Sequence, residues 1–299
     1  MAGEASQEAP EWYKEPCVLG IDEAGRGPVL GPMVYATAFA PISRLKELKA
    51  MGFADSKTLS EEKRDRLYEA LLKEPGLLGH EADVLSAAVI SGKMLSRDRV
   101  SLNALAFDST CKLIDGVLAR GVNLAEAYID ALGDTTKHKD RLSQRFPGVM
   151  FTVEAKADAT YPIVSAASIV AKVTRDRAVK HFVLEEGVES ISTHFGSGYP
   201  ADPDTKKWLE ASIDPVFGFP SLVRFSWSTC NPLLDQHGVP VKFECDADDD
   251  AVPYGQRTLA FGGSGGGGVQ PAGSAPASSG AGRHSYFRAR KLHRAQLAF

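Results

Sequence analysis

Alternating apolar and polar stretches along the chain predict a series of short strands and helices. Cys17–Ile21 is an apolar run typical of a buried strand, and Met33–Ala40 is a second run that we expect to lie antiparallel to it. Ser60 is positioned to cap a helix expected over Glu61–Lys73. Apolar residues then recur at helical spacing over Leu102–Gly121, where the glycine is the expected stop.

The rest of the pattern predicts further elements of both kinds. We expect a strand and turn over Gly79–Ile90, a short strand over Ala127–Asp130, a strand over Val149–Ala157 that delivers Asp158, and helices from Ser165 to about Leu184 and over Asp204–Ile213. The aromatic-rich segment Pro215–Trp227, which includes Phe217 and Phe219, is expected to pack against the domain and close it. This order of elements predicts a mixed α/β fold built in layers.

Composition divides the chain into five segments. We expect a flexible N-terminus (residues 1–16), a main folded domain (17–230), a small C-terminal extension (231–245), a flexible acidic and then Gly/Ser-rich linker (246–282) and a basic tail (283–299). Pro232 beside Asn231 indicates that a helix starts in the extension. The tail carries aromatic residues among its basic ones, so both a docking peptide and a disordered tail remain open for it.

Composition and charge exclude several classes of protein. The hydrophobic share is 43%, and no apolar run reaches the roughly 18–20 residues that span a bilayer. The polar N-terminus has no apolar core of a secretory signal, so we expect a soluble intracellular protein with no membrane partner. The four cysteines are far apart, which favours neither disulfides nor a zinc site. A net charge of −4 argues mildly against a general nucleic-acid coat.

Carboxylates recur at the expected ends of elements. Asp22 and Glu23 follow the first strand, Asp130 ends a later one, and Asp158 follows another. Acids that meet at one point repel each other unless cations intervene, and a set of oxygen ligands without His or Cys suits Mg²⁺ or Mn²⁺. Two such ions about 3.5–4 Å apart can activate water and stabilise the leaving oxygen of a phosphodiester.

These residues also have simpler interpretations. Asp22 and Glu23 alone are equally consistent with a hairpin whose acids lie in solvent at the strand end. Gly25 and Gly27 allow close backbone approach to a ligand, as they would in any tight turn. Lys57 fits a phosphate site before a helix, or an ordinary capped loop.

Several motifs, in a fixed order, resemble the type 2 ribonucleases H. They are Gly20–Pro28 (GIDEAGRGP), Asp55–Lys57 (DSK), Tyr128–Asp130 (YID), Lys156–Asp158 (KAD), Ser165–Asp176 (SAASIVAKVTRD) and Gly196–Pro203 (GSGYPADP). The resemblance extends over about Cys17–Trp227. Within the family, Pro28–Tyr35 and Pro215–Pro220 resemble the catalytic A subunit of the eukaryotic enzyme.

This resemblance implies an RNase H-like fold, in which a mixed sheet is flanked by helices. It implies a metal-dependent endoribonuclease that cleaves the RNA strand of RNA–DNA hybrids. It also implies cuts 5′ to single ribonucleotides in duplex DNA, which leave 3′-hydroxyl and 5′-phosphate ends and serve ribonucleotide removal in DNA replication and repair. Nuclear residence and two accessory subunits, B and C, follow from the same resemblance. Leu233–Phe243 could supply their docking surface.

The resemblance also suggests roles for individual residues. Asp22, Glu23, Asp130 and Asp158 match the four metal-binding catalytic acids. Gly25, Arg26 and Gly27 match the loop that recognises the 2′-hydroxyl, the sole sugar difference between RNA and DNA. Tyr199 matches the residue that stacks at the RNA–DNA junction, the alternative being a core aromatic. Lys57, Ser168, Lys172 and Arg175 are candidates for phosphate contacts or support of the site. Arg175 could equally pair with Asp176 or Glu154, and a solvated helix face explains Lys172 and Arg175 as well.

Three other functions compete with this one. The first is a single-chain bacterial-type enzyme that needs no accessory subunits. The second is a nucleic-acid-binding scaffold that has lost catalysis, which the presence of all four acids disfavours. The third is another nuclease of the superfamily, such as a junction resolvase, which the glycine motif disfavours.

Overall fold

The computed structural model describes residues 9–53, 59–131, 133–183 and 191–240. The chain divides into a unit formed by Met1–Gly238 and a second unit, Val239–Phe299. Almost all of the second unit lies outside the described residues. The linker and basic tail expected from composition, and Val241 and Phe243 of the expected docking surface, therefore also lie outside them.

A mixed five-stranded sheet forms the centre of the fold. The strands are β1 (Cys17–Ala24), β2 (Met33–Pro41), β3 (Gly79–Leu85), β4 (Leu124–Asp130) and β5 (Met150–Glu154), in the spatial order β3-β2-β1-β4-β5. The pairs β1–β2 and β2–β3 are antiparallel, whereas β1–β4 and β4–β5 are parallel. The first two strands therefore form the antiparallel pair that the sequence predicts.

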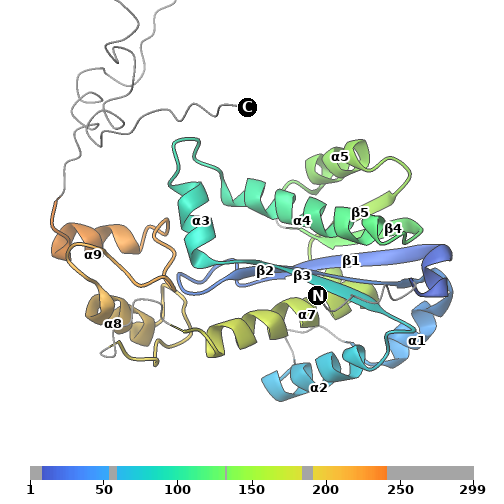
Figure 1. Cartoon of the computed structure of the whole chain (residues 1–299), viewed down its shortest axis with the longest axis horizontal. Helices are drawn as coiled ribbons and strands as arrows, with labels where there is room; N and C mark the ends of the chain where they lie inside the picture. The colour runs from blue at the N-terminus through green and yellow to red at the C-terminus, as the bar shows by residue number, and fades with distance from the viewer. Residues whose placement is uncertain (1–8, 54–58, 132, 184–190, 241–299) are drawn as a thin grey trace, which may run out of the picture. The chain divides into compact units, whose positions relative to one another are not determined.

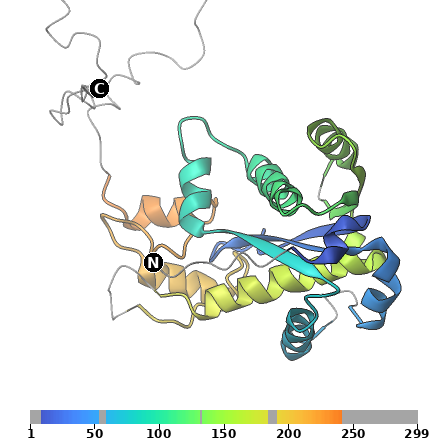
Figure 2. The ribbon, with the colours of Figure 1, turned by 45° about the vertical axis from the view of Figure 1, so that its right-hand side comes forward.

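Helices cover both faces of the sheet (Figures 1 and 2). They are α1 (Leu45–Ala50), α2 (Glu61–Leu72), α3 (Ala87–Met94), α4 (Leu102–Ala119), α5 (Thr135–Arg145), α6 (Ala157–Thr160), α7 (Pro162–Lys180), α8 (Pro203–Ser212) and α9 (Cys230–His237), with short 3-10 helices η1 (Glu11–Lys14) and η2 (Ile42–Arg44). The long helix α7 lies along one face with α2 beyond it, and α4 and α5 lie on the other. No described helix is long and apolar enough to cross a membrane.

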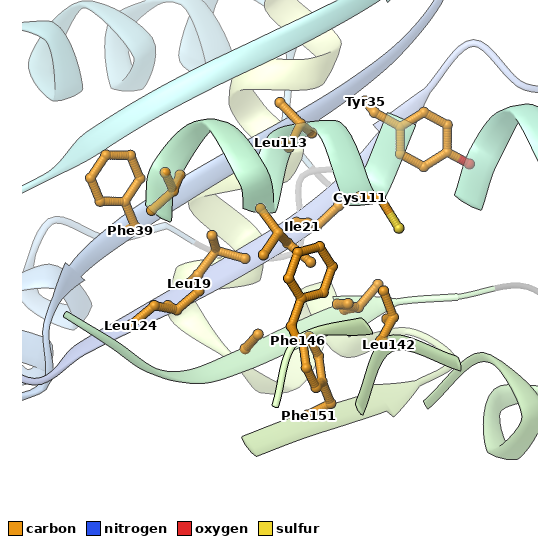
Figure 3. Close-up of a cluster of buried hydrophobic side chains, with 14 of the residues drawn as sticks. Leu19, Ile21, Tyr35, Phe39, Cys111, Leu113, Leu124, Leu142, Phe146 and Phe151 are labelled. Carbon is orange, nitrogen blue, oxygen red and sulfur yellow. The ribbon is translucent and has the colours of Figure 1, made fainter. Parts of the chain in front are cut away.

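The two faces of β1 contribute to two different cores. Leu19 and Ile21 point into a cluster between the sheet and α4–α5, where they meet Leu113, Phe146 and other apolar residues (Figure 3). Val18 and Ala24 belong to the cluster beneath α7. This alternation follows from the two-residue period of a strand, in which neighbouring side chains point to opposite faces of the sheet.

Close packing of α7 on β1 depends on Gly20. A Cβ at Gly20 would lie 2.5 Å from the backbone carbon and oxygen of Ile163, so no other residue fits there without displacing the helix. Small residues of α7, including Ala166 and Ala167, are fully buried against the sheet. The sequence predicts this helix correctly, with its start a few residues too late.

The structure confirms several local predictions and corrects others. Ser60 caps α2 by accepting a hydrogen bond from the Lys63 amide, as expected. The segment expected to be a turn after β3 is helix α3, which is capped by Ser86. Residues before Cys17 pack on the domain, because Trp12 in η1 is buried against Phe39.

The C-terminal part of the first unit has its own small core. Leu30, Trp208, Phe219, Leu222 and Cys230 are buried there. A helix, α9, does start near Pro232, and its Leu233 and Leu234 pack against this core rather than facing solvent alone. Phe217 was expected to pack here, but it is 83% exposed. The reason is local: Asp214 Oδ1 accepts the Val216 and Phe217 amides, which holds a turn with Phe217 at its tip.

Candidate active site

Three carboxylates from distant parts of the chain meet at the end of the central strands. Oxygen atoms of Asp22, Asp130 and Asp158 all lie within 4.8 Å of one another. Asp22 follows Ile21, which pairs with Ile129 of the parallel strand β4, so the next residues of the two strands, Asp22 and Asp130, end side by side. The expected convergence of these acids is therefore what the fold produces.

Asp158 reaches the cluster by a route that differs from the predicted one. It was expected directly at a strand end, but it lies on the short helix α6, after β5 has ended at Glu154. Lys156 makes the turn between them with a left-handed backbone (φ 62°). The Asp158 side chain is buried. A short helix after the turn thus brings Asp158 next to Asp130.

Backbone amides orient Asp130. Its Oδ1 accepts hydrogen bonds from the amides of Lys156 at 2.7 Å and Ala157 at 3.3 Å. These donors compensate part of the negative charge of the carboxylate. The turn that delivers Asp158 therefore also fixes Asp130.

Asp22 is held by groups of α7. Its side chain is 4% exposed and hydrogen-bonds to that of Ser168, which in turn accepts from Lys172 Nζ at 2.6 Å. Burial raises the pKa of Asp22 to about 6, although Lys172 and Ser168 act in the opposite direction. Ser168 and Lys172 thus lie on the α7 side of the sheet, next to Asp22.

Glu23 points to the opposite face of β1. It pairs with Tyr35 of β2, on the side that carries α4 and α5. Burial, followed by repulsion from Asp22, raises the pKa of Glu23 to about 7, while Arg26 lowers it. Asp130 adds to the repulsion, so Glu23 is close enough to the cluster to be coupled to it electrostatically.

The glycine loop (Gly25–Gly27) follows immediately. Gly25 has a positive φ of 79°, and a Cβ there would lie 2.6 Å from the Pro32 oxygen. A Cβ on Gly27 would lie 3.2 Å from the Tyr199 ring. Tyr199 is half-exposed and rests on the loop rather than in a core, which disfavours the core-aromatic alternative.

Sequence reasoning missed Arg224, which holds this loop. Its side chain is fully buried and donates to the carbonyl oxygens of Gly25 (2.5 Å), Arg26 (3.1 Å) and Gly31 (2.8 Å). Burial lowers the pKa of Arg224 to about 9. Trp227 adds a fourth bond, from its indole Nε1 to the Gly27 carbonyl oxygen. A planar guanidinium suits this task, because its donors are fixed in direction.

The other residues predicted for the site lie in different places. Arg175 lies against Gly25 and pairs with Asp176 at 3.2 Å, so of the two acids suggested for it the structure selects Asp176. Arg26 donates to the hydroxyl of Tyr35 and to Asn103 Oδ1. Lys57 and its motif lie outside the described residues.

Comparison with known proteins identifies the family. The model of the family described as Ribonuclease HII matches residues 19–230. The chain belongs to the ribonuclease HII family. It is therefore a ribonuclease H enzyme, and the motifs identified it correctly.

Relatives within the family agree over most of the chain. The A subunit of ribonuclease H2 from Bos taurus is 53% identical over 79% of this chain and 79% of that protein. The A subunit from Arabidopsis thaliana is 52% identical over 81% of each. The solved ribonuclease H2 from Pyrococcus horikoshii OT3 superposes with a TM-score of 0.62 at 32% identity, over 74% of this chain and 98% of that one. The mixed sheet flanked by helices is thus the fold of this ribonuclease family.

We predict that Arg224→Lys destabilises the protein by about 2–4 kcal/mol, because a lysine cannot replace three directed hydrogen bonds to buried carbonyls. Urea denaturation measures the loss, and amide hydrogen exchange should become faster in the glycine loop. Arg145→Lys is the matched control, since Arg145 lies exposed on α5 and pairs with Asp115. Equal stability of the two variants would contradict the role of Arg224.

A second prediction concerns pH. The pKa values of Asp22 and Glu23 are higher in the folded chain than their ordinary values of 3.8 and 4.5. The folded state therefore binds more protons than the unfolded state between the ordinary and the raised pKa values. Stability falls as pH rises from about 4, and the loss is complete above the folded-state values of about 6 and about 7. In EDTA, we expect a loss of about 5 kcal/mol between pH 4 and 8.

Urea denaturation across this pH range checks the prediction. Asp22→Asn removes one of the two groups and should flatten the curve, with higher stability than the wild type at pH 8. The interpretation fails if the variant keeps the wild-type slope.

Proposed function

We propose that the chain is a metal-dependent endoribonuclease that cleaves the RNA strand of RNA–DNA hybrids and cuts 5′ to single ribonucleotides in duplex DNA. The observation that carries this proposal is the meeting of Asp22, Asp130 and Asp158 within 4.8 Å, beside a rigid glycine loop. The products have 3′-hydroxyl and 5′-phosphate ends. The activity serves ribonucleotide removal during DNA replication and repair.

The donor set fits divalent metal ions. All the candidate ligands are carboxylate oxygens, which Mg²⁺ and Mn²⁺ prefer, and the cluster is buried enough that its charge requires compensation. Asp22, Glu23, Asp130 and Asp158 would hold the metal. When bound, two such ions supply activation of water and stabilisation of the leaving oxygen.

The protein side chains orient this centre. Lys172 and Ser168 fix Asp22 from α7, and the amides of Lys156 and Ala157 fix Asp130. Preorganised ligands avoid reorganisation during the reaction, which is how positioning lowers a barrier. Arg175 packs against Gly25, where it is available for support of the loop or for a phosphate contact.

Ribose recognition belongs to the glycine loop. Gly25 admits no side chain because its Cβ position is filled by the Pro32 oxygen, Gly27 lies against the Tyr199 ring, and Arg224 keeps the backbone of the loop fixed. A hydrogen bond to the 2′-hydroxyl distinguishes RNA from DNA. The half-exposed Tyr199 ring next to Gly27 stacks on the sugar at the 3′ side, where its flat face favours deoxyribose.

The relatives, which are named as one subunit of ribonuclease H2, support a proposal about assembly. The chain would act as the catalytic subunit of a nuclear heterotrimer with two accessory subunits, B and C. The docking surface would include Val239, the exposed residue with which the second unit begins. Leu233 and Leu234 contribute less, because they pack partly on the chain's own core.

Asp130→Asn should lower the rate of cleavage by at least about 100-fold while hybrid binding is largely kept. The substrate is a labelled duplex with one ribonucleotide in Mg²⁺, and the product ends are mapped on a sequencing gel. Asp115→Asn, which removes an exposed acid of α4, is the control. The assay is run with and without accessory proteins. Robust cleavage by the chain alone would favour a single-chain enzyme, and retained turnover in Asp130→Asn would contradict the role of the carboxylates.

Tyr199→Ala should reduce the preference for an RNA–DNA junction over continuous RNA by about tenfold, because a stacking surface is lost. The ratio of kcat/KM for the two substrates measures this preference. Tyr199→Phe keeps the ring and should keep the ratio. An unchanged ratio in Tyr199→Ala means that the ring does not select the junction.

A further inference from the structure

A cavity of about 230 Å³ lies between α4 and α5, next to the carboxylates. We call it the α4–α5 cavity. Glu23 and Asp130 line one part of it. Basic and polar side chains line the rest, namely Arg26, Asn103, Lys137, His138 and Arg141. It shares only Arg26 with the glycine loop, and the lining does not include Tyr199.

Among the residues that the structure describes, the cations of this cavity form no ion pair with a carboxylate. Elsewhere among the described residues, Arg120, Arg145 and Arg177 each lie within 4.0 Å of a carboxylate. Over the same residues, Arg26, Lys137 and Arg141 form no such pair. The carboxylate of Asp134 also lines the cavity, but its Oδ1 accepts the Lys137 amide at 3.0 Å and caps α5.

Neutral groups hold two of these cations in place. The guanidinium of Arg141 lies 3.6 Å from the centre of the Phe107 ring. Arg26 is held by the Tyr35 hydroxyl and Asn103. Contacts of this kind position a positive charge without neutralising it, so the charge is available to a ligand.

His138 adds a polar group without a partner. Its Nε2 atom is buried and makes no hydrogen bond among the described residues. Burial, followed by Arg141, lowers the pKa of His138, and a neutral imidazole has one donor and one acceptor nitrogen. A buried polar atom of this kind is costly unless a ligand completes it.

We propose that the α4–α5 cavity binds one phosphate of the cleaved strand, the neighbour of the scissile phosphate. This inference rests on the proposed function, since it requires the scissile phosphate to lie at the carboxylates. Glu23 belongs both to the coupled acids and to the cavity wall, so a strand at the acids continues past Lys137 and Arg141. Contacts to the phosphate backbone set the register of a nucleic acid on a protein.

The chemistry of the cavity excludes other ligands. Arg26, Lys137 and Arg141 place positive charge in the part of the cavity away from Glu23 and Asp130, which disfavours a metal ion there, and an apolar ligand would gain nothing from these cations. A phosphate matches both the charge and the forked donors of Arg141. The cavity would therefore extend the site from the carboxylates towards α4 and α5.

The test replaces single phosphates of the substrate by neutral methylphosphonates. Each linkage near the ribonucleotide is replaced in turn, and KM and kcat are measured for the wild type, Arg141→Gln and Lys137→Gln. Arg145→Gln, on the same helix but paired with Asp115, is the matched control. Arg141→Lys keeps the positive charge at the cavity. It therefore separates the effect of losing the charge from the effect of losing the packing on Phe107.

We expect Arg141→Gln to raise KM about tenfold on the unmodified duplex with little change in kcat, and to lower the salt dependence of binding by about one phosphate contact. In the wild type, one methylphosphonate next to the scissile linkage should raise KM by a similar factor. In Arg141→Gln the same replacement should have almost no further effect, since the two groups form one contact. Arg141→Lys should restore most of the sensitivity.

The proposal would be overturned if, in both the Arg141 and the Lys137 variants, the increase in KM from the substitution and the increase from the methylphosphonate multiplied at every linkage. Lys137 is exposed, so Lys137→Gln tests the cavity even if Arg141→Gln does not fold. Failure of the proposed function is a distinct result, because the wild type would then not cut the unmodified duplex at all.

Discussion

Mutual repulsion of carboxylates is the constraint on which this structure depends. Asp22, Asp130 and Asp158 lie within 4.8 Å of one another, and burial makes their charges harder to screen. The fold meets this cost with donors from two directions, the Ser168–Lys172 pair on one side and backbone amides of the turn at Lys156 on the other. A divalent cation at the cluster would reduce the repulsion further.

Because β1 is pleated, its successive side chains point to opposite faces of the sheet. Asp22 points to α7, which provides its supports, whereas the neighbouring Glu23 points to the α4–α5 face. Two adjacent acids in the sequence therefore act in different surroundings. The close approach of α7 at Gly20 makes the first of these surroundings possible, since a bulkier residue would push the helix away from Asp22.

Much of this arrangement could be predicted from the sequence, and the rest depends on contacts that a local pattern does not contain. The apolar run of β1 followed by two acids predicts a strand that ends in carboxylates, and Asp130 follows the same logic. The helical position of Asp158 could not be predicted in this way, because the left-handed turn at Lys156 has no glycine to mark it. Helix α5 was not expected either, since its sequence is almost entirely polar and Leu142 is its one apolar residue. Arg224 was missed because nothing around it indicates which carbonyls a buried guanidinium meets almost 200 residues earlier.

The distance between Arg224 and the loop it stabilises has a consequence for how the enzyme is made. During translation, the acids at Asp22, Asp130 and Asp158 leave the ribosome well before Arg224 and Trp227. A nascent chain therefore has all three acids of its charged centre before the glycine loop gains four of its hydrogen bonds. The loop reaches its final conformation only after the last part of the domain is made, and a chain cut short before Arg224 would lack these four bonds.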